Sequence, residues 1–181
     1  DLRDVALGPN GILSGLGPGA IYADHSTVSA DIARELYQTA REAGLNFLDA
    51  PVSGGQSGAE NGALSIMVGG DAEAFGAARA VMAHYGRAVA HMGGPGAGQL
   101  TKMVNQIAIA GLVQALAEAM NFAVRSGLDA DRVIGVISKG AAGSWQLDNR
   151  AATMVEGKFD FGFAVDWMRK DLQICLDEAR R

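Results

Sequence analysis

The stretch "GPGAGQLTKMVNQIAIAGLVQALAEAM", residues 94–120, begins the helix that decides how this chain is organised. Apolar residues continue with few breaks to residue 126. A helix over residues 99–126 is about 42 Å long at a rise of 1.5 Å per residue. Such a helix is too long to cover one face of a small domain. We therefore predict that it bridges two structural parts of the chain.

On the N-terminal side of this helix, strands and helices alternate. The sequence predicts strands at 20–26 and 45–52 around an amphipathic helix at 29–44, with Ser29 as its cap and Gly44 as its stop. This order is a βαβ unit, in which the two strands run parallel. The elements that follow are a strand at 62–70, a helix at 71–86 and a strand at 87–93.

No strand is predicted after residue 94. A helix at 127–140, with Asp129 as its cap, and a helix at 162–181 complete the chain. The predicted fold class is therefore α/β, followed by an all-α part. The predicted boundaries are an α/β domain at 1–92, a bridging helix at 93–127 and an all-α domain at 128–181.

The composition excludes several classes of partner and site. The chain has 181 residues and a net charge of −5, which gives it no electrostatic reason to bind nucleic acid or an anionic membrane. A single cysteine, Cys175, rules out an internal disulfide and suits the cytoplasm. The longest apolar run, 107–120, carries Gln114 and Glu118 and falls short of a membrane span. We predict that it forms a buried helix.

Lys102 and Asn105 are the polar residues that stand out in the opening stretch. They are three positions apart, so both side chains lie on one face of the helix and can reach one ligand atom. A lysine among apolar neighbours is partly desolvated, which lowers its pKa toward the range that a general acid or base needs. The alternative is that Lys102 extends to solvent and Asn105 caps or packs. The pair alone leaves both interpretations open.

Ser53, Gly54 and Gly55 follow the strand at 45–52. Two glycines in succession expose backbone amides at the carboxyl end of a strand, where open α/β sheets bind ligands. These amides and the Ser53 hydroxyl suit a carboxylate, although an ordinary glycine turn is the alternative. Other motifs are rejected: "GLGPGA" precedes a strand, "GPGAG" lacks the lysine of a P-loop, and three scattered histidines with one cysteine give no zinc spacing.

Taken together, "DHST", "DAPVSGG", "GALSIMVGG", "GAGQLTKMVNQ" and "MRKDL" occur in an order and spacing that resembles the β-hydroxyacid dehydrogenase family. The resemblance covers nearly the whole chain. It implies a Rossmann-like domain, a long helix and a helical domain, with NAD or NADP as cofactor and a small carboxylate as substrate. It also implies interconversion of a 3-hydroxy acid and its semialdehyde.

The resemblance assigns a role to each candidate residue. Lys102 would be the catalytic lysine, and Asn105 would orient the reacting oxygen. Ser53, Gly54 and Gly55 would hold the substrate carboxylate. Thr27 would lie against the cofactor, and Lys170 would close over cofactor and substrate.

One departure from the family pattern concerns phosphate binding. The family carries a strand, a GxGxxG turn and a helix for the pyrophosphate, and this sequence has no such segment. We therefore expect a chain truncated at both ends, and we leave open whether it turns over substrate alone. An exposed sheet edge would favour a homo-oligomer. The alternative functions are a noncatalytic dehydrogenase-like scaffold and an enzyme for a different acid, with 56–59 and 143–149 lining its pocket.

Overall fold

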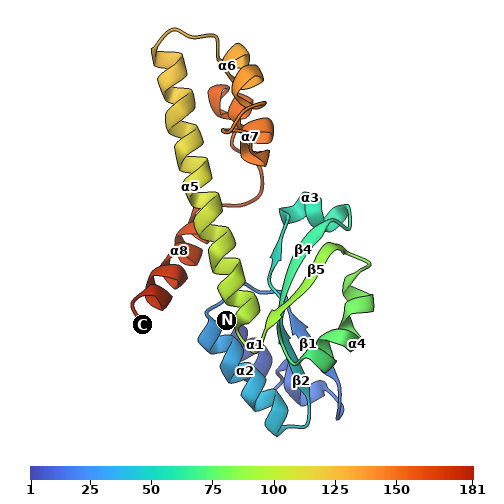
Figure 1. Cartoon of the computed structure of the whole chain (residues 1–181). Helices are drawn as coiled ribbons and strands as arrows, with labels where there is room; N and C mark the ends of the chain where they lie inside the picture. The colour runs from blue at the N-terminus through green and yellow to red at the C-terminus, as the bar shows by residue number, and fades with distance from the viewer. The chain divides into compact units, whose positions relative to one another are not determined.

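The computed structural model describes residues 1–181, which form two compact units. The first unit contains Asp1–Gln106 and Phe163–Arg181, and the second contains Ile107–Gly162. One helix, α5 (Ala97–Arg125), begins in the first unit and ends in the second (Figure 1). The predicted long helix is therefore present.

A mixed five-stranded sheet forms the centre of the first unit. Its strands are β1 (Ile21–Asp24), β2 (Asn46–Asp49), β3 (Val52–Ser53), β4 (Leu64–Gly70) and β5 (Gly86–Gly93). β1 and β2 pair in parallel, as the βαβ prediction requires, and β4 and β5 also pair in parallel. β4 runs antiparallel to both β2 and β3. The sheet order is thus β1, then β2 with β3, then β4, then β5.

The strand predicted at 45–52 divides into β2 and β3. Ala50 and Pro51 lie between them, and proline has no backbone N–H to donate to a ladder. The Pro51 carbonyl still accepts from the Met67 amide at 3.0 Å, so the chain stays beside β4 through the break. The division turns Ser53 onto the far part of β4, where it pairs with Ser65.

Helices pack on both faces of this sheet (Figure 1). They are α1 (Leu2–Leu7), α2 (Ala30–Glu42) and α4 (Ala72–Met82). The same unit also contains α3 (Gly55–Glu60), α8 (Val165–Ala179) and a short 3-10 helix at Ile12–Gly15. Ser29 caps α2, as predicted, by accepting from the Ile32 amide at 3.3 Å. No prediction was made for α1, the 3-10 helix or α3, because each is too short to show a helical period.

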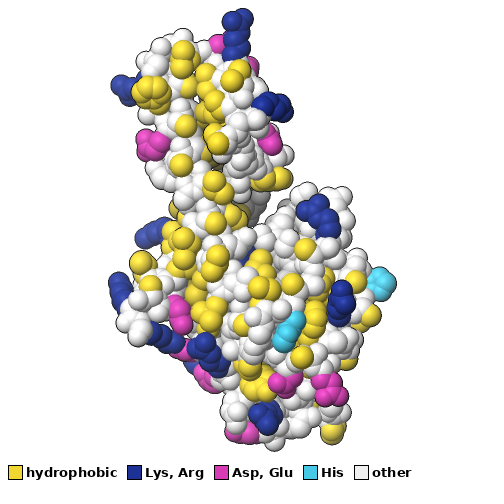
Figure 2. Space-filling model, in the orientation of Figure 1, with side chains coloured by type: hydrophobic (Ala, Val, Ile, Leu, Met, Phe, Trp, Pro, Cys, Tyr) yellow, Lys and Arg dark blue, Asp and Glu magenta, His cyan; other side chains and the backbone are white.

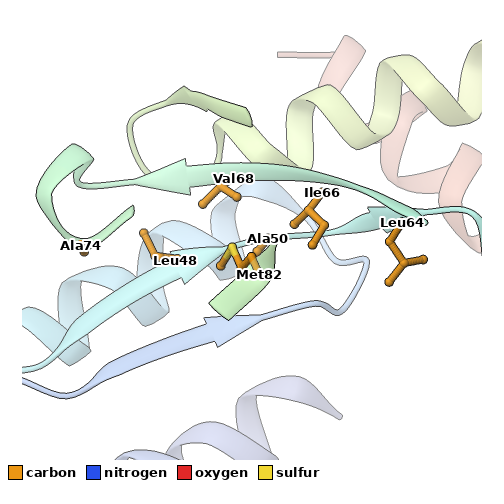
Figure 3. Packing of buried hydrophobic residues seen from close by; sticks show 7 residues of the cluster. All are labelled: Leu48, Ala50, Leu64, Ile66, Val68, Ala74 and Met82. Atoms are coloured by element: carbon orange, nitrogen blue, oxygen red, sulfur yellow. The ribbon is translucent and has the colours of Figure 1, made fainter. Parts of the chain in front are cut away.

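Two apolar clusters form the core of the first unit. One gathers Leu48, Ala50, Leu64, Ile66, Val68, Ala74 and Met82 between the strands and α4 (Figure 3). The other gathers Ala6, Ala33, Leu36, Ala40, Leu45 and Phe47 against α1 and α2. Phe47 and Leu48 are neighbours on β2 and point to opposite faces, so β2 contributes to both clusters. Each such large side chain contributes about 1.5–3 kcal/mol by its burial.

The second unit is helical. The C-terminal part of α5 packs with α6 (Ala130–Ile137) and α7 (Trp145–Val155) around Leu116, Met120, Leu147 and Ala151. Asp129 caps α6, as predicted, by accepting from the Arg132 amide at 3.1 Å. α7 was not predicted. Its signal is Ser144, which caps it, followed by Leu147 and Ala151 four residues apart on the buried face.

The expectation of a buried, short apolar run in α5 is wrong in this chain. Only 11% of the most apolar window of α5 is buried, and Figure 2 shows apolar side chains at the surface along this helix. With a mean hydropathy of 1.6, α5 is long and apolar enough to cross a membrane. The core helix of a soluble protein passes the same test. The apolar stretch is longer than predicted because its polar residues are mostly uncharged amides.

The position of α8 differs from the predicted boundary at 128–181, because α8 belongs to the first unit. Two of its side chains bury themselves against the first turns of α5. Asp171 accepts from Gln106 at 2.6 Å, and the Cys175 thiol lies 3.8 Å from the Met103 carbonyl. These contacts are between residues far apart in the sequence, so composition alone could not reveal them.

Candidate active site

Asp49, at the end of β2, holds the first turn of α5. Its side chain is 1% exposed, and its two oxygens accept from the backbone amides of Gly96 at 2.8 Å and Gln99 at 2.9 Å. These amides are donors that a helix start cannot satisfy internally. Burial raises the pKa of Asp49, and the backbone amides of the helix start oppose that rise. The carboxylate thereby fixes where α5 leaves the sheet.

Gly98 allows α5 to approach the sheet this closely. A Cβ on Gly98 would collide with the backbone carbonyl oxygens of Met67 and Asp49. Gly96 has a φ of 88°, a conformation that only glycine adopts readily. The two glycines that the sequence marked as turn residues are therefore required for different reasons, one by space and one by conformation.

Gln99 is fully buried and clamps the loop that follows β1. Its Nε2 donates to the Ser26 carbonyl at 2.8 Å, and its Oε1 accepts from the Val28 amide at 3.1 Å. Because one amide side chain binds both sides of Thr27, the loop can neither slide nor rotate without breaking two buried hydrogen bonds. Thr27 is thus held at the carboxyl end of β1, where parallel strands present ligands.

Lys102 lies one helical turn beyond Gln99 and is only 7% exposed. The ammonium group takes part in no hydrogen bond or ion pair in the structure. Burial lowers the pKa of Lys102. The charge of Asp171 opposes this effect, and the charge of Lys170 adds to it. The lysine is therefore closer to the neutral state than an exposed lysine would be.

A chain of polar side chains begins on the same turns of α5. Asn105 donates from Nδ2 to Gln106 Oε1 at 2.8 Å, and Gln106 donates from Nε2 to Asp171 Oδ2 at 2.6 Å. On the preceding residue of α8, Lys170 Nζ lies 3.0 Å from Asp171 Oδ1 and donates to the Thr27 carbonyl at 2.7 Å. The chain thus runs from α5 through α8 to the loop after β1.

The structure brings together four of the residues that the sequence singled out, which are Lys102, Asn105, Lys170 and Thr27. Ser53, Gly54 and Gly55 lie at the end of β3 and the start of α3 in the same unit. Gly54 and Gly55 have φ values of 134° and 59°, so the turn requires glycine at both positions. No hydrogen bond or ion pair joins these three residues to the polar chain around Lys102.

Sequence reasoning missed Asp49, Gln99 and Asp171, and it considered Gln106 only as the alternative should replacement of Asn105 prove silent. For the two glutamines a signal was present, since positions 99, 102 and 106 fall on one face of a helix and all three are polar in an apolar stretch. All three side chains are buried. Polar side chains in a row on a buried helix face indicate that they bind other groups of the protein and not water. Asp49 and Asp171 carried no such pattern, because their partners lie on other elements.

Two surface hollows lie away from this cluster. One runs along α5 and includes Glu118, Phe122 and Arg125, and the other lies beside Gly19 and Asp71 at the opposite region of the sheet. Neither contains a residue of the polar chain. The candidate site is therefore defined by its side-chain chemistry and not by either of these hollows.

Comparison with known protein families agrees with this architecture. Residues 1–94 match the family model described as the NAD binding domain of 6-phosphogluconate dehydrogenase. Residues 96–181 match the model described as NAD-binding of NADP-dependent 3-hydroxyisobutyrate dehydrogenase. The boundary between the two matches falls at the glycines that begin α5.

Individual relatives extend the comparison. An uncharacterized oxidoreductase of Shewanella frigidimarina is 60% identical over all of this chain, and a 3-hydroxyisobutyrate dehydrogenase of Pseudomonas aeruginosa is 36% identical over 99% of it. The chain spans 62% of the length of each. The solved Mycobacterium tuberculosis 3-hydroxyisobutyrate dehydrogenase with L-serine is 33% identical, with a TM-score of 0.83 over 93% of this chain and 60% of that one.

These matches cover both the sheet unit and the residues from α5 onward, and they agree with the motifs that the sequence carries. The chain has the Rossmann-type fold with a long helix that these relatives share. This chain belongs to the β-hydroxyacid dehydrogenase family, the family of the 3-hydroxyisobutyrate dehydrogenases.

Proposed function

We propose that this chain is part of an NAD(P)-dependent oxidoreductase that interconverts a small 3-hydroxy acid and its semialdehyde. The observation that carries the proposal is Lys102, a nearly buried lysine with a lowered pKa and no ion pair, on a helix start held rigidly by Asp49. A structural lysine would be expected to reach solvent or to pair with a carboxylate. A lysine held in this way is suited to proton transfer.

Lys102 would act as the acid/base group. In oxidation its neutral Nζ accepts the proton of the substrate hydroxyl. In reduction its protonated Nζ returns a proton to the aldehyde oxygen. Because burial lowers its pKa, both protonation states are accessible near neutral pH more readily than for an exposed lysine. General acid/base catalysis of this kind typically contributes about 10²–10⁴-fold to a rate.

Asn105 would orient the reacting oxygen. Its Nδ2 carries two hydrogens, and one of them is donated to Gln106 Oε1. The other is free to hold the substrate oxygen beside Lys102. Ser53, Gly54 and Gly55 would hold the substrate carboxylate through a hydroxyl and backbone amides. The role of these three residues rests on the family resemblance, since no hydrogen bond or ion pair of the structure joins them to Lys102.

The loop after β1 fits one end of a nicotinamide cofactor. Its Ser26 and Thr27 carbonyls and its Val28 amide are already bound by Gln99 and Lys170. The Thr27 amide and hydroxyl donate to no other group of the chain and are available to a ligand at the carboxyl end of β1. Bound NAD or NADP would supply the hydride chemistry. Thr27 and Lys170 would hold it in place.

The substrate class follows from the named relatives. 3-Hydroxyisobutyrate and the L-serine bound to the Mycobacterium enzyme each have a carboxylate and a primary hydroxyl on the β carbon. We infer a substrate with the same two groups. Residues 56–59 and 143–149 remain the proposed determinants of which acid is preferred.

The protein would work as a homo-oligomer in the cytoplasm. Large apolar side chains are exposed on both units, among them Phe122, Val136, Val165 and Trp167. Exposed apolar surface of this extent is typical of an interface. Sedimentation at several protein concentrations tests this part of the proposal, and a monomer at every concentration would refute it.

The test of the proposed function is oxidation of NADH and NADPH, followed by absorbance. The substrates are a panel of semialdehydes: the aldehyde formed by oxidation of 3-hydroxyisobutyrate, tartronate semialdehyde and succinate semialdehyde. Lys102→Met keeps the length of the side chain and removes the charge. Lys139→Met, at an exposed position, is the matched control. We expect Lys102→Met to lose about 10²–10⁴-fold in kcat, with cofactor affinity within about twofold of the unmutated chain.

Two outcomes would overturn the proposal. If Lys102→Met keeps its turnover, or loses cofactor binding together with turnover, the acid/base role is wrong. If the unmutated chain binds neither cofactor nor substrate, the noncatalytic scaffold becomes the better description of this chain.

A further inference from the structure

Asp171 is a buried carboxylate that the proposed chemistry does not use directly. Asp171 is 3% exposed, although burial of an isolated charge at such a site costs several kcal/mol of folding free energy. Oδ2 accepts from Gln106 Nε2 at 2.6 Å, which is a short, charge-assisted hydrogen bond. Oδ1 is also buried, and it forms an ion pair with Lys170, whose Nζ lies 3.0 Å away without hydrogen-bond geometry. Both oxygens of the carboxylate are thus engaged, one by an amide and one by an ammonium group.

Gln106 places this carboxylate beside Lys102. Lys102 and Gln106 are four residues apart on α5, so their side chains lie on the same face, one turn from each other. Both are buried, at 7% and 2% exposure. The carboxylate that Gln106 holds acts on Lys102 through its charge, without forming an ion pair with it.

Lys170 connects the same carboxylate to the loop after β1. Its Nζ donates to the Thr27 carbonyl at 2.7 Å while lying beside Asp171 Oδ1. Lys170 is itself partly exposed, with 44% of its side chain accessible, whereas 4% of the Asp171 side chain is accessible. The buried carboxylate thus pairs with a lysine that is bound to the loop carrying Thr27.

We propose that Gln106 and Asp171 are positioning residues: Gln106 fixes the Asp171 carboxylate, and the carboxylate holds the Lys170 ammonium over the loop after β1 and favours the protonated form of Lys102 by its charge. The inference rests on the proposed function for its kinetic consequence. Its structural part concerns the chain alone. Neither residue needs to touch the substrate for this role.

The charge of Asp171 has a direct consequence for Lys102. Two charged groups act on Lys102, and both come from α8: Asp171 raises its pKa and Lys170 lowers it. Cys175, also on α8, faces the Met103 carbonyl, and burial raises the pKa of its thiol. Replacing Asp171 by asparagine removes the one group that favours the protonated lysine. The pKa of Lys102 should then fall further.

The first experiment measures this pKa without substrate or cofactor. The chain has four lysines, at 102, 139, 158 and 170, so reductive methylation with ¹³C-formaldehyde gives few NMR signals, and substitution assigns each one. We expect Asp171→Asn to lower the pKa of Lys102 and to leave that of Lys139 unchanged. Asp177→Asn, at an exposed carboxylate on the same helix, is the matched control and should leave Lys102 unchanged.

The second experiment separates positioning from folding. Gln106→Met keeps the volume of the side chain but removes the donor to Asp171, and Gln114→Met is the control on an exposed turn of α5. We expect Gln106→Met to lower kcat by about tenfold or more, the equivalent of one charged hydrogen bond, with little change in KM. The pH profile should shift with kcat. Circular dichroism identifies a variant that has not folded. Asp171→Glu, which keeps the charge, should retain more activity than Asp171→Asn.

The results distinguish this inference from the proposed function. An unchanged Lys102 pKa in folded Asp171→Asn overturns the inference, whatever the chain catalyses. An unchanged kcat and pH profile in Gln106→Met overturns it as well. Activity that persists in Lys102→Met overturns the proposed function, whereas a lowered Lys102 pKa in Asp171→Asn would still support the structural part.

Discussion

Replacing Asp49 by alanine should weaken the first unit more than removal of an ordinary helix cap. Asp49 is 1% exposed and accepts from the Gly96 and Gln99 amides at 2.8 and 2.9 Å. A hydrogen bond to a charged group contributes about 1.5–3 kcal/mol, and two amides would be left buried without an acceptor. Burial of the carboxylate, which raises its pKa, offsets part of this sum. We expect a net loss of about 2–4 kcal/mol in the free energy of unfolding.

The assay is hydrogen exchange of the amides in β2 and β4, because these report the opening of the first unit alone. Ser29→Ala is the matched control, since Ser29 caps α2 through a single bond of 3.3 Å in the same unit. Loss of such a cap costs about 1 kcal/mol. A loss for Asp49→Ala no larger than that of Ser29→Ala would refute the view that this carboxylate fixes α5 to the sheet.

Three further predictions concern two glycines of α5, Lys102 and Tyr22. Gly98→Ala should lower the free energy of unfolding by about 1–3 kcal/mol, because the new Cβ would collide with backbone carbonyls. Gly111→Ala has open space around its Cβ and should raise that free energy by about 0.5–1 kcal/mol; urea unfolding measures both changes. Because the Lys102 pKa is lowered and oxidation needs the neutral amine, the rate of oxidation should rise with pH through that pKa, and the rate of reduction should fall; a pH profile that Lys102→Met does not flatten would contradict this. Burial and the charge of Asp24 raise the pKa of Tyr22 to about 12, so its contribution to stability should be present below about pH 10 and lost as the pH rises toward 12, which tyrosinate absorbance of native and urea-unfolded protein can follow.

The sequence predicted the elements that have a clear period or cap. β1, α2 and the parallel pairing of β1 with β2 followed from alternating strand and helix patterns, and Ser29 and Asp129 are caps as expected. Short elements had too few residues to show a period. α7 was not recognised because the glycine-containing segment before it is typical of a loop. The division of one predicted strand into β2 and β3 depends on a proline whose effect is local.

The candidate site was predictable to the extent that its residues lie on one element. Lys102 and Asn105 were identified because both interrupt the same apolar helix, and Gln99 and Gln106 belong to the same polar stripe. Asp171 could not be recognised as their partner, because a hydrogen bond between residues 65 positions apart leaves no local pattern. Lys170 and Thr27 were reached only through the family resemblance. Their contact at 2.7 Å is a property of the folded chain.

The arrangement of these contacts explains why the glutamines of α5 are buried in an otherwise apolar stretch. Gln99 binds the loop after β1 and Gln106 binds α8, so two neutral amides on one helix face attach two other elements to α5. Lys102 lies between them, one turn from each. Neutral amides make these attachments without adding charge beside the lysine, whereas carboxylates at either position would raise its pKa. The same stripe therefore assembles the site and leaves Asp171 as the carboxylate that opposes the effect of burial on Lys102.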